Sequence, residues 1–263
     1  MTTLQPAGSE TDHESGPSVD KSAPHRGLST RVLVACAAAV LVSGLFAYVA
    51  VRYRSENSQS AEIRASGIPS NVSTPVADLM QLSPVPRHFA PEFTLVDQNG
   101  RTMSLSSFRG RTVVLEFMDP HCVDICPIVS QEFVDAYHDL GPAAAGAVFV
   151  AVNVNQYYTE VAEAAAFSNA QGLTAIPNWH FFTADPDTLK TVWADYAVEV
   201  SAPNPNADIV HSSLVYFIDP TGHERYLASP MVDHTSSGSA YLPRDQIGSW
   251  GQGIASVVRS LSG

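Results

Sequence analysis

The chain has 263 residues, of which 45% are hydrophobic, enough for one large or two small globular domains. Its formal net charge is −12, from 14 Lys and Arg against 26 Asp and Glu, which suits a cationic protein patch or a metal cation and argues against a nucleic-acid partner. Only two of the three cysteines, Cys122 and Cys126, follow the apolar N-terminal region, and this excludes a disulfide-stapled scaffold.

Residues 1–31 have the composition of a disordered tail. They are rich in Ser, Thr, Pro and Gly and show no apolar periodicity. Four acidic residues in this stretch argue against a mitochondrial transit peptide: Glu10, Asp12, Glu14 and Asp20.

Residues 32–51 are the one strongly hydrophobic segment, without a charge between Arg31 and Arg52. Their length predicts a transmembrane helix. A cleavable signal peptide is the alternative, but the apolar run is longer than a usual signal segment and Tyr48-Val49-Ala50 is a poor cleavage site. Cys36 belongs to this span, because Arg31 stands where a lipoprotein signal needs an apolar stretch. Basic residues flank the span equally, so charge does not orient it.

Residues 52–81 have the polar composition of a linker, and residues 82–263 are predicted to form one domain. This domain holds 8 Lys and Arg against 19 Asp and Glu. It opens with a predicted hairpin over residues 93–105, whose turn is Asn99-Gly100. Residues 113–117 are mostly apolar, include β-branched residues and follow Gly110, which predicts a short buried strand.

Two cysteines follow this strand, in the sequence His121-Cys122-Val123-Asp124-Ile125-Cys126-Pro127. Apolar residues at helical spacing then predict a helix that ends at Gly141-Pro142. Pro127 suits the first helical position, so we expect Cys126 at the cap and Cys122 on the loop just outside. Free N–H groups and the helix dipole are then expected to lower the pKa of both thiols.

Thiolates at such a position can perform disulfide chemistry or hold a soft metal ion. The familiar redox pair is C-x-x-C, whereas C-x-x-x-C separates the sulfurs by one more residue and leaves room for an ion. Two thiolates under-coordinate Cu(I), and an imidazole commonly completes a trigonal site. Two cysteines that merely pack in the core fit this helix start less well. Asp124 is expected to be a solvated charge at the start of the helix. His121 is expected to tune a thiol pKa and contact a partner, or merely to be exposed.

The rest of the domain alternates strands and helices. Strand patterns cover residues 147–152, 179–183, 213–218 and 225–227, with a turn at 219–222. Helical patterns cover residues 159–171, 186–196 and 246–261. Such alternation with a terminal hairpin predicts an α/β sheet covered on both faces.

Residues 90–117 resemble the opening of thioredoxin-like and peroxiredoxin-like domains. The cysteine segment is more specific, since it resembles the motif H-C-P-D-[VI]-C-P of the Sco/SenC family of copper chaperones. His211-Ser212-Ser213 resembles that family's H-S segment before a later strand. The resemblance implies a thioredoxin-like α/β fold, with a central sheet and flanking helices. It also implies a copper site of Cys122, Cys126 and His211 that holds Cu(I), with Cu(II) as an alternative.

The chain departs from that family at three positions. Val123 stands where the family has proline, and Asn153 and Tyr157 stand where it has acidic residues. Redox enzymes of this fold carry a cis-proline near the position of Ser212 and Ser213, and its absence here argues against a dedicated disulfide oxidoreductase. Met231 and His234 are not expected to form a second soft-metal site, because no further ligand converges with them.

The family resemblance implies a membrane-anchored, extracytoplasmic copper chaperone with residues 1–31 in the cytoplasm. Its partner would be the subunit of cytochrome c oxidase that bears the CuA centre, or another copper protein, and it would deliver copper or keep that centre's cysteines reduced. The alternative is an enzyme, a thiol–disulfide oxidoreductase with Cys122 as nucleophile and Cys126 as resolving thiol. A peroxiredoxin comes third, because no P-x-x-x-T precedes Cys122.

Overall fold

The computed structural model describes residues 48–52 and 67–262. The helical segment 48–52 belongs to a unit of residues 1–56, and the rest to a unit of residues 57–263. Across these described ranges, no helix has the length and apolar character needed to cross a membrane. The predicted tail and most of the predicted span, Cys36 included, lie outside the described residues, so both stay predictions.

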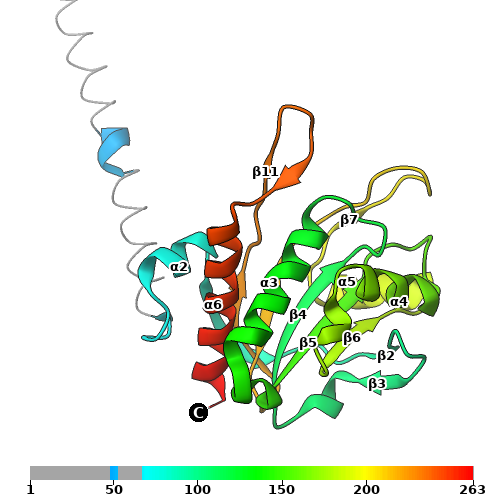
Figure 1. Cartoon of the computed structure of the whole chain (residues 1–263), viewed down its shortest axis with the longest axis horizontal. Coiled ribbons are helices and arrows are strands. Elements are labelled where there is room, and N and C mark those ends of the chain that lie inside the picture. Colours follow the sequence, from blue (N-terminus) through cyan, green and yellow to red (C-terminus); the bar gives the residue numbers. More distant parts are fainter. Residues whose placement is uncertain (1–47, 53–66, 263) are drawn as a thin grey trace, which may run out of the picture. The chain divides into compact units, whose positions relative to one another are not determined.

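A six-stranded mixed sheet organises the second unit, in the order β1-β10-β9-β4-β5-β6 (Figure 1). The strands β4, β5 and β6 run parallel to one another. The other three neighbouring pairs, β4 with β9, β9 with β10 and β10 with β1, are antiparallel. Every residue of β4 and β5 is buried, as expected for central strands covered on both faces. The bounds are β1 (Ser83–Phe89), β4 (Thr112–Met118), β5 (Ala147–Asn153), β6 (Trp179–Phe182), β9 (Val215–Ile218) and β10 (His223–Ala228).

Helices cover one face of the sheet and mixed elements the other. Val114 and Met118 of β4 pack with α3, α4 and α6, while Val113 and Leu115 pack with α5 and the β2–β3 hairpin. This alternation follows from the period of two along a strand. In Figure 1, α3 and α6 lie side by side over the sheet. The helices are α2 (Thr74–Leu79), α3 (Ile125–Leu140), α4 (Val161–Ala170), α5 (Pro186–Asp195) and α6 (Arg244–Leu261).

The predicted hairpin and every predicted strand and helix of the domain are present. The hairpin consists of β2 (Thr94–Val96) and β3 (Thr102–Ser104), and Gly100 in its turn has φ +74°, a value that glycine adopts without strain. The helix after the cysteines ends at Gly141, as predicted, but it begins two residues early, with Asp124 as N-cap. Pro127 is therefore the third helical residue, where its missing N–H costs no helical hydrogen bond.

Several elements were not predicted. β1 carries Pro84 and Pro86, and it is an edge strand, where prolines are tolerated. Residues 67–80, assigned by composition to the linker, contain α2 and place Met80 in the core. Two hairpins complete the unit: β7 (Val200–Ser201) with β8 (Val210–His211), and β11 (Asp233–His234) with β12 (Ala240–Tyr241).

Candidate metal centre

The two cysteines lie where β4 ends and α3 begins. The N–H of Cys122 donates to the carbonyl of Asp119 at 3.1 Å, which closes a tight turn after β4. The N–H of Cys126 donates to the sulfur of Cys122 at 3.4 Å. Cys122 is half-buried and Cys126 is buried, and both are free thiols. One sulfur is therefore accessible and the other lies beneath it.

The two thiols have opposite pKa shifts. The pKa of Cys122 is lowered to about 7, chiefly because the Cys126 thiol donates a hydrogen bond to its sulfur. The pKa of Cys126 is raised well above 9, because its thiol is that donor and because burial disfavours its thiolate. The prediction that both values fall is therefore right for Cys122 and wrong for Cys126. Burial and the neighbouring sulfur outweigh the helix dipole at the deeper position.

His211 lies at the same end of the central strands as the two cysteines. It ends β8, shortly before β9, which runs antiparallel to β4. The start of β9 therefore lies beside the end of β4. The ring Nδ1 of His211 lies 3.0 Å from the carbonyl oxygen of Ser212. A carbonyl only accepts, so Nδ1 carries the hydrogen and the lone pair of the neutral ring is on Nε2. Burial lowers the pKa of His211 and so favours the neutral ring that metals bind.

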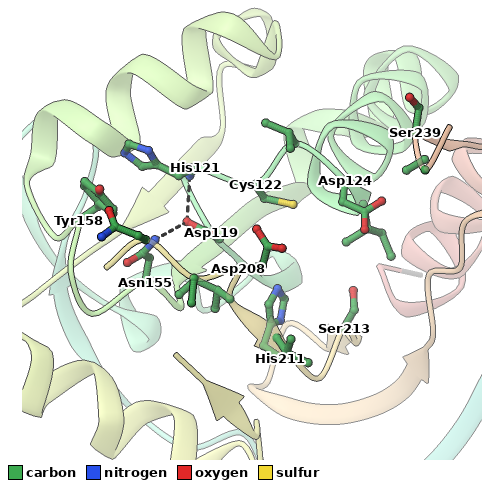
Figure 2. A pocket seen from close by; sticks show the side chains of 18 of the residues that line it. Asp119, His121, Cys122, Asp124, Asn155, Tyr158, Asp208, His211, Ser213 and Ser239 are labelled. Carbon is green, nitrogen blue, oxygen red and sulfur yellow. Dashed lines mark hydrogen bonds between the residues drawn. The ribbon is translucent and has the colours of Figure 1, made fainter. Parts of the chain in front are cut away.

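Cys122 and His211 line one cleft of about 930 Å³, and Figure 2 shows both side chains turned toward it. Cys126 lies below its floor, in the core cluster. Among residues 48–52 and 67–262, no three His, Cys, Asp or Glu side chains are grouped closely enough to hold a metal ion. The structure thus brings two of the three predicted ligands to one cleft with the third beneath, and the full ligand set stays a prediction.

A polar network holds the loop that carries Cys122. A single carboxylate oxygen of Asp119 accepts from the N–H of His121 at 2.8 Å and from the side chain of Asn155 at 2.9 Å (Figure 2). The His121 ring stacks on Tyr158 at 3.9 Å and contacts Glu163 of α4 at 2.9 Å. His121 is thus anchored toward α4, and its ring nitrogen is engaged there.

Two of the departures from the family motif have structural partners. The Asn153 side chain donates to the Tyr158 carbonyl at 2.8 Å and to the Thr183 hydroxyl at 3.2 Å. A carboxylate has no hydrogen to make these bonds. The Tyr157 hydroxyl donates to the carbonyl of Ala202 at 2.8 Å. Because Ala202 directly follows β7, Tyr157 ties the loop after β5 to the hairpin that carries His211.

Two buried carboxyl groups lie close enough to influence each other, one on β4 and one on α3. Glu116 of β4 accepts from the Ser213 hydroxyl at 2.8 Å, and burial raises its pKa to about 8. Burial and the neighbouring Glu116 raise the pKa of Glu132 of α3 as well. Within the part of the chain that the structure describes, the buried side-chain oxygens without a hydrogen-bond partner are one on Glu116 and both on Glu132. The only sequence signal for Glu116 is an acidic residue inside the apolar run 113–117.

Asp124 and His234 meet at the rim of the cleft. A ring nitrogen of His234 lies 3.0 and 3.2 Å from the two carboxylate oxygens of Asp124, which joins β11 to the start of α3. Asp124 is exposed, as predicted, but it is paired. Met231 instead contacts Gln81, so it and His234 have separate partners.

Comparison with known proteins gives consistent matches. The sequence model described as SCO1/SenC matches residues 83–236. A SCO1 protein homolog of Bacillus subtilis is 22% identical over 132 residues, 49% of this chain and 68% of that protein. A candidate peroxiredoxin of Mycobacterium tuberculosis is 27% identical over 146 residues, 51% of this chain and 86% of that protein. The structure of Bradyrhizobium japonicum ScoI with copper bound has a TM-score of 0.51 at 19% identity, covering 66% of this chain and 99% of that chain. The fold is accordingly thioredoxin-like.

Proposed function

The chain belongs to the SCO1/SenC family, and on that premise we propose that it binds one copper ion through Cys122, Cys126 and His211 and passes it to a partner protein. The proposed partner is the subunit of cytochrome c oxidase that holds the CuA centre, or another copper protein. That a solved protein of similar fold, ScoI, holds copper supports copper as the cargo.

One observation carries this proposal. A thiolate-forming sulfur, Cys122, and a neutral imidazole, His211, line the same cleft from segments far apart in the chain. Thiolate and imidazole are ligands that suit Cu(I), and Cys126 lies directly under Cys122 to supply the second sulfur. The hydrogen bond from Nδ1 of His211 to the Ser212 carbonyl leaves Nε2 as the free nitrogen, the usual arrangement of a metal-binding histidine.

The depth of the three groups suggests an order of ligand exchange. An acceptor thiolate approaches through the cleft, so it meets the side of the ion held by Cys122 and His211 first. Cys126, which is buried, releases last. Its raised pKa means that the freed sulfur takes up a proton at neutral pH, which makes release harder to reverse.

The membrane location is part of the proposal. Residues 32–51 would span the membrane, with residues 1–31 in the cytoplasm and residues 52–263 outside the cytoplasm, where the copper acceptor lies. Protease added to intact cells or spheroplasts should then remove the large domain. Protection of that domain would reverse the orientation.

A second candidate function is thiol–disulfide exchange, favoured by a specific observation. Cys122 has a pKa of about 7 and Cys126 is a buried thiol beside it, which is the pairing of an attacking and a resolving cysteine. The similarity to a candidate peroxiredoxin supports the same reading. Both functions need both cysteines, so cysteine variants cannot separate them.

His211 separates the two candidates. Titration of the reduced full chain with Cu(I) against a chromophoric chelator should give one ion per chain, bound at least about tenfold more weakly by His211→Ala, since one ligand is lost. His138→Ala, an exposed histidine near the end of α3, is the matched control. Unchanged copper affinity in His211→Ala would contradict the three-ligand site and favour a plain dithiol site. Full rescue of oxidase maturation in cells by His211→Ala would contradict copper delivery and favour the oxidoreductase.

A further inference from the structure

The cleft over Cys122 is wider than a copper ion requires. Its floor is the loop between β4 and α3, and its walls are the β7–β8 hairpin with residues 205–211 and the β11–β12 hairpin with residues 237–240. Figure 1 shows both hairpins projecting at the end of the unit where the cleft lies. A volume of about 930 Å³ holds a peptide segment.

The lining of this cleft is charged with one sign. It contains Asp119, Asp124 and Asp208, and no Lys or Arg is among its described lining residues. Figure 2 shows the Asp208 carboxylate turned toward the cleft. Several basic side chains of the domain pair with acidic groups elsewhere, for example Arg101 with Asp97. A cleft lined by one sign of charge concentrates ligands of the opposite sign.

Two exposed apolar side chains face the same space. Val123 is 91% exposed and Val210 is 68% exposed, and both line the cleft. Single exposed valines are ordinary on a protein surface. These two, however, directly adjoin Cys122 and His211 in sequence, one on the floor and one on a wall. A partner segment that fills the cleft over the proposed ligands can therefore contact both.

Both walls are held in place. The bond from the Tyr157 hydroxyl to the Ala202 carbonyl fixes the β7–β8 side, and the pairing of His234 with Asp124 fixes the β11–β12 side. The cleft therefore exists before a partner arrives, which reduces the entropy that binding must overcome.

We propose, building on the copper function above, that this cleft docks an extended segment of the acceptor protein that carries basic side chains beside a small apolar contact. The basic groups face Asp208 and Asp124, and the apolar contact lies on Val123 and Val210. An anionic membrane surface or a second copy of this acidic chain would meet like charge at the same place.

The test uses the copper-free full chain and two fluorescein-labelled peptides without cysteine. Both peptides carry one central leucine, flanked by lysines in one and by glutamates in the other. Fluorescence anisotropy at low salt should show the lysine peptide binding at least about tenfold more tightly than the glutamate peptide, and the difference should shrink at high salt.

Variants locate the binding. Asp208→Asn and Val210→Ser should each weaken lysine-peptide binding severalfold. The matched controls are Asp187→Asn at the start of α5 and Phe89→Ser at the end of β1. They remove an exposed charge and an exposed apolar group outside the cleft, so they should not weaken lysine-peptide binding. Equal binding of the two peptides, or equal effects of Asp187→Asn and Asp208→Asn, would overturn the proposal. Peptide docking does not depend on copper, so a chain that docks the lysine peptide but fails the copper titration would sink only the proposed function.

Discussion

The backbone N–H of Cys126 points at the sulfur of Cys122 across 3.4 Å, and the Cys126 thiol also donates to that sulfur. The pair therefore shares its charge unequally. The accessible sulfur is stabilised as a thiolate, and the buried sulfur keeps its proton. An incoming Cu(I) ion or a disulfide would meet the reactive sulfur first. Binding of the ion to both sulfurs requires the deeper one to lose its proton.

The first prediction concerns that hydrogen bond. In the reduced protein, alkylation of Cys122 by iodoacetamide should rise with pH around a midpoint near 7. Cys126→Ala removes the thiol donor, so the pKa of Cys122 should rise toward its ordinary value of 9.0. Cys126→Ser keeps a hydroxyl donor and should shift the midpoint less. Peptide mapping by mass spectrometry gives the rates, and identical midpoints in all three proteins would contradict the assigned cause.

The second prediction concerns the buried carboxyl of Glu116. Its pKa rises from 4.5 to about 8 on folding, so the folded state holds this proton more firmly than the unfolded chain. The contribution to stability is complete below pH 4.5 and is lost as pH rises toward 8. Glu116→Gln cannot ionise, so its advantage over the native chain should grow by about 1.4 kcal/mol per pH unit in that window, to a few kcal/mol.

Urea unfolding at pH 5 and pH 8 measures this effect. Glu160→Gln makes the same chemical change at an exposed position and is the control. A constant difference between Glu116→Gln and the native chain at both pH values would show that Glu116 is charged in the folded state.

The third prediction concerns Tyr157 as a residue that positions His211. Tyr157→Phe removes the donor to the Ala202 carbonyl and should cost about 1 kcal/mol of stability. Amide hydrogen exchange should accelerate in residues 199–212 and remain unchanged in α6. Copper affinity should fall severalfold, because His211 would be held less firmly in position. Tyr137→Phe on α3 is the control, and exchange that rises equally throughout the unit would indicate a general loss of stability instead.

The fourth prediction concerns the family's acidic position at Asn153. Asn153→Asp restores the family residue but places a carboxylate against the Tyr158 carbonyl and removes both donated bonds. We expect a loss of about 1–3 kcal/mol at neutral pH, because a buried acceptor loses its donor. Thermal unfolding should show a lower Tm, and the deficit should narrow at acidic pH where the new carboxyl is protonated. Asn169→Asp, exposed on α4, should change the Tm much less.

The central architecture could be predicted because its signals are local. The apolar runs of β4 and β5 need no partner to be recognised as buried strands, and Asn99-Gly100 specifies its own turn. The two short hairpins have two residues per strand, which is too few for a pattern. β1 was hidden by Pro84 and Pro86, since only its place at the edge of the sheet makes those prolines acceptable.

For the candidate site, the sequence predicts which residues to consider but not their physical state. The motif indicated Cys122, Cys126 and His211, but the raised pKa of Cys126 depends on its burial, which only the packing of α3 determines. The free Nε2 of His211 depends on where the Ser212 carbonyl points. The hydrogen-bond partners of Tyr157 and Asn153 lie in other parts of the fold. The sequence therefore shows that these two residues differ from the family's acidic residues, but not which hydrogen bonds they make.

The antiparallel direction of β9 against β4 also sets when the site can exist along the folding pathway. Cys122 and His211 come from distant parts of the chain. They lie at the same end of the sheet only after β9 has paired with β4. Bringing these two residues together closes a long loop, which costs conformational entropy. In an unfolded or partly synthesised chain this loop is still open. Such a chain still has its C-x-x-x-C sulfurs, but the His211 imidazole is not yet beside them. Three-ligand copper binding would therefore begin only with a completed sheet, and the bound ion would in turn favour the folded chain by mass action.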